Sequence, residues 1–263
     1  MTEDGESYYA DGAWYDAEYV HIGGDIPYYV RVAQETPGPI LELACGTGRL
    51  TIPMAETGRP VTGVDIAPGM LAHAEKKRAA LPAERQANLR FVAGDMRSLR
   101  LGERFEAVIL AFNTLMHMTE DEDLRATLET AREHLSDTGR FHLDLHTPYP
   151  TLAQQREPGG RYDPQQMIDP HTGHRYVVTE NNRYDPRTQI NTMCFYYRRA
   201  DGQGRPIGPE REEVLRLRVI FPRELDLWIQ LAGLRVVGDY DDFAHSRPFS
   251  GEGGRRVLIL GRR

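Results

Sequence analysis

Cysteine is scarce in this sequence, and long apolar runs are absent. The 263 residues include only two cysteines, Cys45 and Cys194, which lie far apart and show no metal-binding or disulfide-framework spacing. No apolar run approaches the roughly 20 residues that cross a bilayer. The acidic start, residues 1–6, lacks the apolar segment of a secretion signal. These features predict a cytoplasmic protein with reduced thiols, no metal site and no membrane contact.

An excess of positive charge is also missing. Lysine and arginine number 32 against 39 acidic residues, which gives a net charge of −7. This balance argues against nucleic acid as a partner, because nucleic-acid binding requires a basic footprint. Hydrophobic residues make up 40% and charged residues 27% of the chain, as in globular proteins with a sizeable core. The length predicts one large domain, or one domain with an elaboration.

The stretch from Ile40 to Leu50, ILELACGTGRL, organises the chain. A short apolar run ends in a tight turn at Gly46 and Gly48, and a helical pattern follows. This strand, turn and helix start presents free backbone N–H groups to a nucleotide-like ligand. The dinucleotide fingerprint G-x-G-x-x-G requires a third glycine where this chain has Thr51, which weakens an interpretation as a nicotinamide or flavin enzyme.

Acidic or polar residues end the next three predicted strands. Residues 61–65 end in Asp65, about 20 residues past the turn, where a carboxylate accepts hydrogen bonds from ribose hydroxyls. Residues 91–96 end in Asp95-Met96, and residues 105–111 are followed by Phe112-Asn113. The carboxyl ends of parallel strands meet at one edge of a sheet, so these residues are expected to share a site.

These motifs, in this order, resemble those of class I S-adenosylmethionine-dependent methyltransferases. The resemblance covers about residues 38–146 and the last forty or so. It implies an α/β fold: a Rossmann-like, doubly wound, mostly parallel seven-stranded sheet that binds S-adenosyl-L-methionine. The implied cofactor-binding residues are Tyr15, Glu42, Ala44, Gly46, Thr47, Gly48, Arg49, Asp65, Ile66, Met70, Asp95, Met96, Phe112 and Asn113.

The pattern changes between residues 147 and 221. After a proline-rich stretch that is predicted as loop, residues 147–172, three long β-branched and aromatic stretches follow without helices between them. They predict a three-stranded antiparallel insert after the fifth strand of the core. The core is then residues 1–146 and 222–263, with residues 1–36 as an N-terminal helical lid. The last two strands have no helix between them, so they are expected to pair antiparallel.

The insert is similar in position to that of amino-sugar N,N-dimethyltransferases from macrolide pathways. That resemblance implies a small-molecule acceptor, such as an amine or hydroxyl of a natural-product precursor. It also implies a homodimer formed through the insert. A three-stranded sheet with one apolar face needs a cover, so it is expected to roof the active site.

The catalytic residue is not fixed by any motif. Methyl transfer requires alignment of the reactants and exclusion of water, and a base only where the nucleophile must lose a proton. The candidates are His117 and His146, at the carboxyl ends of predicted strands, and Tyr15 in the lid. An imidazole that titrates near neutral pH is suited to accept such a proton.

Two other functions are compatible with parts of the pattern. A cofactor-bound member that does not methylate, such as a pericyclase or a structural protein, would keep the same glycine turn. A nucleotide-binding oxidoreductase would also keep the strand–turn–helix, although Thr51 and the Gly94-Asp95-Met96 signature speak against it. The sequence does not distinguish N- from O-methylation.

Overall fold

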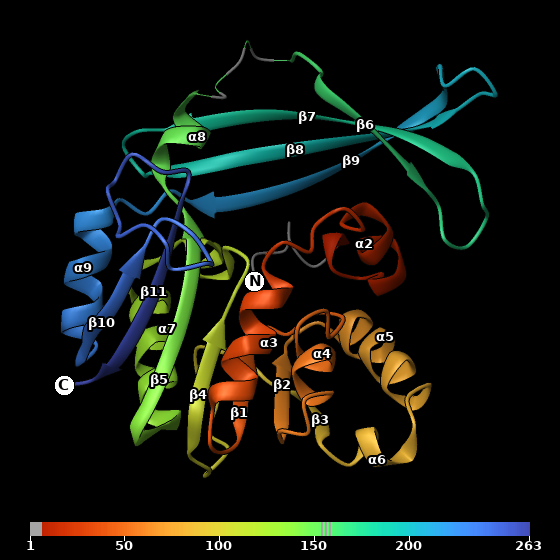
Figure 1. The fold of residues 1–263 in the computed structure, drawn as a ribbon. Coiled ribbons are helices and arrows are strands. Elements are labelled where there is room, and N and C mark those ends of the chain that lie inside the picture. The colour runs from red at the N-terminus through yellow and green to blue at the C-terminus, as the bar shows by residue number, and fades with distance from the viewer. Residues whose placement is uncertain (1–6, 154, 156, 158) are drawn as a thin grey trace.

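The computed structural model describes residues 7–153, 155, 157 and 159–263. Seven strands form the core sheet in the order β10-β11-β5-β4-β1-β2-β3 (Figure 1). The first five strands of the chain pair in parallel, whereas β11 runs antiparallel to both of its neighbours. The predicted Rossmann-like sheet and its antiparallel final hairpin are therefore confirmed. Its strands are β1 (Ile40–Leu43), β2 (Val61–Asp65), β3 (Leu89–Ala93), β4 (Phe105–Leu110), β5 (Leu135–His146), β10 (Leu234–Tyr240) and β11 (Arg255–Arg262).

Helices cover both faces of this sheet because β1 and β4 are apolar on both sides. Leu41 and Leu43 pack into the cluster that includes α7 and α9, while Ile40 packs into the cluster that includes α3 and α4. Successive strand residues point to opposite faces, so the two clusters lie on opposite sides of the sheet. The helices are α2 (Gly12–Glu18), α3 (Ile26–Glu35), α4 (Thr51–Ala55), α5 (Pro68–Ala79), α6 (Ala83–Gln86), the 3₁₀ turn η1 (Thr114–His117), α7 (Asp121–His134), α8 (Pro148–Ala153) and α9 (Pro222–Leu231).

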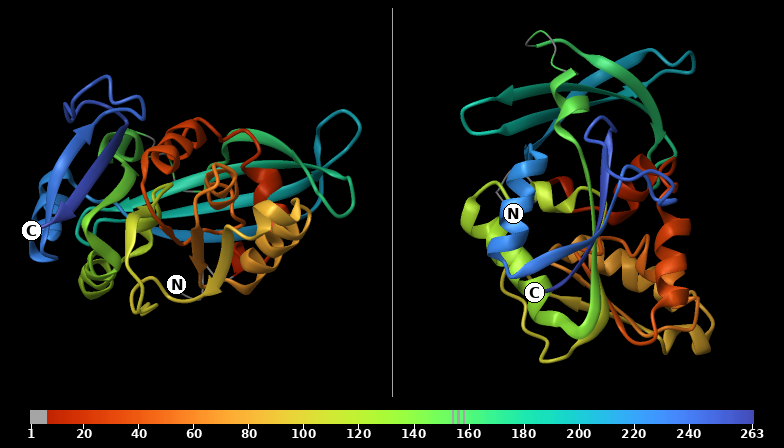
Figure 2. Two further views of the ribbon diagram at one scale, coloured as in Figure 1. Left: turned by 60° about the horizontal axis from the view of Figure 1, so that its bottom comes forward. Right: turned by 60° about the vertical axis from the view of Figure 1, so that its left-hand side comes forward.

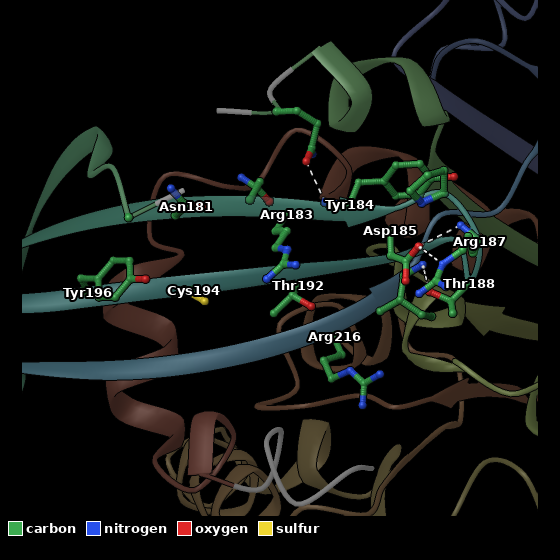
Figure 3. Close-up of a pocket in the computed structure, with 15 residues that line it drawn as sticks. Asn181, Arg183, Tyr184, Asp185, Arg187, Thr188, Thr192, Cys194, Tyr196 and Arg216 are labelled. Carbon is green, nitrogen blue, oxygen red and sulfur yellow. Dashed lines mark hydrogen bonds and ion pairs between the residues drawn. The ribbon is translucent and has the colours of Figure 1, made fainter. Parts of the chain in front are cut away.

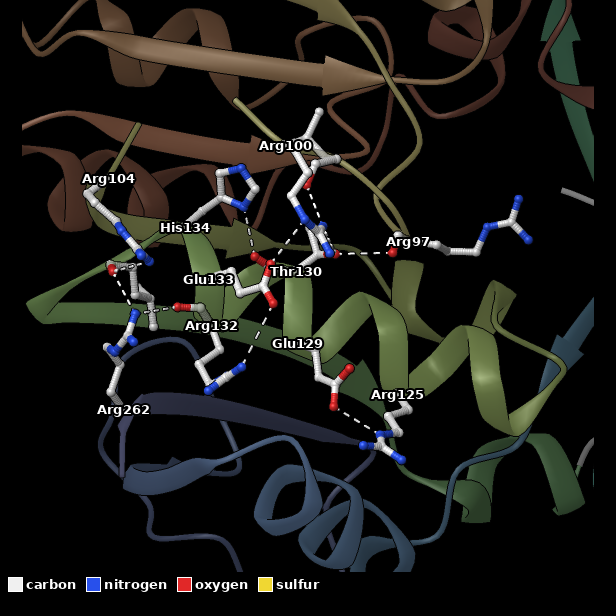
Figure 4. Close-up of polar contacts among 12 residues, drawn as sticks. Arg97, Arg100, Arg104, Arg125, Glu129, Thr130, Arg132, Glu133, His134 and Arg262 are labelled. Carbon is white, nitrogen blue, oxygen red and sulfur yellow. Dashed lines mark hydrogen bonds and ion pairs between the residues drawn. The ribbon is translucent and has the colours of Figure 1, made fainter. Parts of the chain in front are cut away.

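Arginines from distant segments hold the carboxyl end of α7 (Figure 4). Arg262 donates to the carbonyl oxygens of Arg132 and Leu135, at 2.9 and 3.1 Å. Cations at a helix C-terminus satisfy free carbonyl groups and complement the helix dipole. His134 Nε2 accepts from the Leu101 N–H, so its Nδ1 carries the proton and donates to the Thr130 carbonyl at 2.8 Å. These contacts fix α7 against the sheet that carries the site.

The insert is a separate antiparallel sheet of four strands in the order β6-β7-β8-β9. It lies across the carboxyl ends of the core strands, with α2 between the two layers (Figures 1 and 2). Its strands are β6 (Tyr162–Ile168), β7 (Arg175–Asp185), β8 (Ile190–Ala200) and β9 (Pro206–Arg218).

The prediction of three strands, with residues 147–172 as loop, is wrong on two counts. Residues 148–153 form α8, and β6 pairs with β7 despite Pro164. Pro164 is tolerated because β6 is an edge strand, and the ladder is irregular between Tyr162 and Gln165. The strand β9 begins at Pro206 and is the other edge strand, where a proline is likewise tolerated.

The lid helix α2 joins the insert to the core. Asp11 caps its first turn by accepting from the N–H groups of Ala13 and Trp14. At the other end of the helix, Glu18 accepts from the Tyr197 hydroxyl of β8 at 2.9 Å. Tyr8 and Phe195 belong to the same apolar cluster, which fills the space between α2 and the insert. Within the described residues, no helix combines the length and apolar character needed to span a membrane.

Candidate active site

One cavity of about 660 Å³ lies where the core strands, the lid helix and the insert meet. Its volume falls within the roughly 300–1,000 Å³ that is typical of small-molecule sites. It brings together all three candidate catalytic residues, His117, His146 and Tyr15. The predicted cofactor-binding residues that line it are Tyr15, Ala44, Gly46, Asp65, Ile66, Met70, Asp95, Met96, Phe112 and Asn113.

The two glycines of the turn have different roles. Both have positive φ, +55° at Gly46 and +76° at Gly48, which disfavours any side chain. A Cβ on Gly46 would have no neighbour within 4 Å, and Gly46 lines the cavity, so this glycine leaves open space there. A Cβ on Gly48 would lie 2.8 Å from Cζ of Phe91, so Gly48 allows close packing instead.

Asp65 connects the turn to the end of β2. Its carboxylate accepts from the Gly46 N–H at 2.7 Å and from the Ala67 N–H at 2.8 Å. Burial raises the pKa of Asp65, although these backbone hydrogen bonds oppose the rise. A carboxylate has about four acceptor sites, so Asp65 keeps lone pairs for a ligand hydroxyl.

Three predicted cofactor-binding residues do not line the cavity and instead support the glycine turn on its side away from the cavity: Glu42, Thr47 and Arg49. Glu42 accepts from the Thr51 hydroxyl, and burial raises the pKa of Glu42 to about 8. Arg49 forms a two-pronged ion pair with Asp25, with both N–O distances 2.7 Å. The predicted cofactor contacts of these residues and of Gly48 stay predictions.

Asp95 lines the cavity beside a cation. The Arg97 guanidinium binds its carboxylate at 2.6 Å and holds the pKa of Asp95 below its usual value. Arg97 also pairs with Asp123 of α7 at 2.8 Å. The positive charge of Arg97 is therefore already compensated by two carboxylates.

The loop after β4 is strained. Phe112 and Asn113 have φ of 58° and 62°, an uncommon region for residues other than glycine. Two contacts with β5 hold them: the Phe112 N–H donates to Asp144 at 3.0 Å, and Asn113 Oδ1 accepts from the His146 N–H at 2.6 Å. Such strain clusters at functional sites, where the surrounding structure maintains it. Here it places the Phe112 ring at the cavity, with the Arg49 guanidinium 4.8 Å from the ring centre.

The two candidate histidines do not titrate near neutral pH, contrary to the expectation from sequence. Burial lowers the pKa of His117 to about 4, and its Nε2 lies 3.2 Å from the Tyr9 hydroxyl. Desolvation by the surrounding protein lowers the pKa of His146 to about 4, and the Arg255 cation adds to this effect. A terminal nitrogen of Arg255 lies 3.0 Å from Nε2 of His146. Both imidazoles are therefore neutral at pH 7, and burial raises the pKa of Tyr15 so that its phenol stays protonated.

Several cavity residues were not predicted from the sequence. From the lid side, Tyr9, Glu18 and Tyr19 line the cavity. The density of tyrosines in residues 8–19 is the one sequence signal for these lid residues. The sheet of the insert contributes four polar residues to the lining, Gln165, Glu180, Asn182 and Asn191. Among the described residues, no group of three or more His, Cys, Asp or Glu side chains could hold a metal ion.

A second hollow of about 690 Å³ lies on the opposite face of the insert (Figure 3). Arg183, Thr192 and Arg216 form one cross-strand row there, since the register pairs Thr192 with both arginines. Figure 3 shows these side chains on the open face of the sheet, away from the core.

Comparison with known proteins assigns the core. A family model described as a methyltransferase domain matches residues 40–139. A dTDP-3-amino-3,4,6-trideoxy-alpha-D-glucopyranose N,N-dimethyltransferase of Streptomyces venezuelae is 33% identical over 122 residues, 46% of this chain and 48% of that protein. A cypemycin N-terminal methyltransferase of a Streptomyces species is 28% identical over 85% of this chain and 82% of its own length.

The similarity in structure extends beyond the core. The CcbJ methyltransferase from Streptomyces caelestis superimposes with a TM-score of 0.74 and 29% identity, covering 91% of this chain and 95% of that one. By sequence, in contrast, the chain spans only about half the length of several curated relatives, 59%, 47% and 48%. The matched family model, the ordered motifs and the geometry of the turn agree, and residues 40–139 form a methyltransferase domain with the motif order of the class I S-adenosylmethionine-dependent enzymes.

Proposed function

We propose that this protein transfers a methyl group from S-adenosyl-L-methionine to a nitrogen or oxygen of a small molecule. The observation that carries the proposal is the single cavity, in which the glycine turn and Asp65 open directly into a space roofed by the insert. A cofactor on the core side and an acceptor on the insert side would share one enclosed volume.

The residues present fit a cationic, ribose-bearing cofactor. Gly46 leaves room beside the turn, and Asp65 offers carboxylate lone pairs for ribose hydroxyls. The rings of Tyr15, Tyr19 and Phe112 line the same space, and aromatic faces attract cations. When bound, S-adenosylmethionine supplies a methyl group on a positively charged sulfur that a nucleophile displaces in line.

The chain's own contribution is alignment, enclosure and a proton acceptor where one is needed. The lid helix and the insert shield the cavity from water, which strengthens electrostatic contacts inside it. We assign His117 as the first candidate for the base, because its imidazole is neutral and faces the cavity. A base with a pKa of about 4 holds a proton only weakly, so a neutral amine would react by alignment alone.

The experiment is a label-transfer assay. Purified protein is incubated with S-adenosylmethionine carrying a radioactive methyl group and with a panel of small primary amines, secondary amines and matching alcohols. Label in an acceptor is the expected result, and Gly46→Val, which fills the space beside the turn, should abolish it. Binding of the cofactor by calorimetry without label transfer to any panel member or to a cell extract would instead favour a non-methylating member of the family.

We also propose a cytoplasmic homodimer. Cys45 and Cys194 are both free thiols, as expected in a reducing compartment. On the open face of the insert, the row with Arg183 and Arg216 lies at one end and Glu212, which pairs with Tyr196 in register, lies toward the other. A two-fold axis lying in the plane of this face, perpendicular to the strands, would place the arginines of one copy against the acidic end of its partner.

Sedimentation tests the dimer. The wild-type protein should sediment as a dimer at micromolar concentration, and Arg183→Glu combined with Arg216→Glu should produce monomers. A monomeric wild type would remove the dimer and leave the proposed reaction unaffected.

A further inference from the structure

A polarised chain of amide side chains crosses the roof of the cavity. Gln155 Nε2 donates to Asn191 Oδ1 at 3.4 Å, and Asn191 Nδ2 donates to Asn182 Oδ1 at 2.9 Å. Asn182 Nδ2 then donates to Glu180 Oε1 at 3.1 Å. Asn182 and Asn191 are only 6% and 3% exposed, so an apolar pair would be less costly to bury.

The carboxylate at the end of this chain determines its direction. An ionised carboxylate can only accept hydrogen bonds, so Asn182 must turn its NH₂ group toward Glu180. Its oxygen then faces Asn191, which in turn must present its own NH₂ group and direct its oxygen to Gln155. Every amide dipole therefore supports negative charge on Glu180, and Glu180 lines the cavity. Burial raises the pKa of Glu180, and a bound cation would reverse that rise.

Carboxylates outnumber the permanent cations around the cavity. Four carboxylates of described residues line it: Glu18, Asp65, Asp95 and Glu180. The two arginines of the lining are already paired, Arg97 with Asp95 and Asp123, and Arg255 with Asp144 at 2.5 Å.

The other basic residues of the lining are His21, His117 and His146, of which His117 and His146 are neutral at pH 7. Both arginines of the described lining have carboxylate partners, and it contains no lysine. A phosphate group with its two negative charges would therefore meet no unpaired arginine or lysine, in a lining that carries four carboxylates.

We propose that Glu180 is the acceptor-binding residue for an amino group, and that the cavity takes amine acceptors without phosphate. This rests on the proposed methyl transfer and specifies its acceptor class. It also separates this chain from enzymes that act on nucleotide-diphosphate sugars, because a diphosphate would face the same excess of carboxylates and no unpaired arginine or lysine.

Calorimetry on the protein saturated with S-adenosylhomocysteine tests the proposal at pH 7. The probes are glucosamine, glucose and glucosamine 6-phosphate, which differ only in the amino group and the phosphate. Glucosamine should bind at least tenfold more tightly than glucosamine 6-phosphate. Glu180→Gln should weaken glucosamine roughly tenfold or more, the loss of a charged hydrogen bond, and change glucose by less than about twofold.

A matched control lies on the exposed helix α6, outside the cavity and the proposed dimer face. Glu84→Gln removes one carboxylate charge there and should leave all three affinities unchanged. Thermal unfolding and S-adenosylhomocysteine affinity should match the wild type in both variants, which excludes misfolding as the cause.

Three results would overturn the proposal: equal affinity for glucosamine and its phosphate, an unchanged glucosamine affinity in Glu180→Gln, or no glucosamine binding at all. The outcomes remain separate from the proposed reaction. Failure to bind S-adenosylhomocysteine or to transfer label removes the methyl transfer. Normal label transfer together with an unchanged glucosamine affinity in Glu180→Gln removes only the assignment of Glu180. The same titrations without S-adenosylhomocysteine measure acceptor binding by itself.

Discussion

Asp16 of the lid helix accepts a hydrogen bond from the Thr47 hydroxyl of the glycine turn, with 2.5 Å between the two oxygens. The same carboxylate binds Nζ of Lys77 at 2.8 Å and lies 3.2 Å from Nε2 of His73, both on α5. The lid is thus attached directly to the turn that we propose supports the cofactor. This contact joins a residue near the start of the chain to the strand, turn and helix that begin the core.

The attachment predicts that Asp16→Ala opens the lid and accelerates cofactor release. Loss of a charge-assisted hydrogen bond costs about 1.5–3 kcal/mol, so S-adenosylmethionine should bind roughly tenfold or more weakly. Stopped-flow fluorescence would measure the dissociation rate, and Thr47→Val should produce part of the same effect. Glu84→Ala, on the exposed helix α6, is the control and should change neither quantity. An unchanged dissociation rate in both lid variants would contradict the attachment.

Asp65→Ala is predicted to weaken S-adenosylmethionine binding by roughly tenfold or more. The reason is twofold: the variant lacks the lone pairs proposed for the ribose, and it leaves the Gly46 N–H without its acceptor at 2.7 Å. Calorimetry gives the affinity, and Asp65→Asn separates the two causes because an amide oxygen can still accept from one backbone N–H. Affinity equal to the wild type in Asp65→Ala would remove Asp65 from the cofactor site.

The sequence was sufficient for the core because its signals are local. An apolar run, a glycine turn and a helical pattern follow each other within residues 40–55. Asp65 ends β2, and Asp95 lies two positions past the end of β3. Residues that end parallel strands must meet at one edge, so their gathering could be predicted without knowing any contact.

The rest of the site depends on contacts between distant segments. Glu18 and Tyr197 are 179 positions apart, and nothing local in either stretch predicts their hydrogen bond. The sequence predicts no strand at β6 because Pro164 is a local signal against strand formation. Its position at the edge of the sheet allows β6 to form despite this proline. The low pKa of His117 likewise arises from burial under Tyr9 and the lid, which composition does not reveal.

For an acceptor that must lose a proton, His117→Ala is predicted to lower turnover at least tenfold while leaving cofactor affinity within about twofold, in line with general-base contributions of about 10²–10⁴. Because the pKa of His117 is about 4, the wild-type rate should show no inflection from this group between pH 6 and 9. Tyr9→Phe removes the hydroxyl at 3.2 Å from His117 and should cost about fivefold, the loss of one neutral hydrogen bond. Full turnover of His117→Ala across pH 6–9 would remove His117 as the base and leave His146 as the candidate, since the phenol of Tyr15 stays protonated.

Glu42 makes stability depend on pH in a direction opposite to that of most carboxylates. Burial raises its pKa to about 8, so the folded protein binds more protons than the unfolded chain between the ordinary pKa near 4.5 and about 8. The stability contributed by the protonated form is complete below pH 4.5 and is lost as the pH rises through 8. For one proton the slope is at most about 1.4 kcal/mol per pH unit.

Glu42→Gln should therefore gain stability relative to the wild type as the pH rises from 5 to 8, by about 1–3 kcal/mol in the cofactor-free protein. Glutamine keeps an oxygen that can accept from the Thr51 hydroxyl, so the comparison isolates the ionisation of Glu42. Urea unfolding at pH 5, 6.5 and 8 measures the difference, with Glu84→Gln on the exposed helix α6 as the control that should show no trend. A difference that stays constant over this range would mean that Glu42 is already ionised in the folded protein at pH 5, with its charge stabilised by Thr51 and the nearby Arg49.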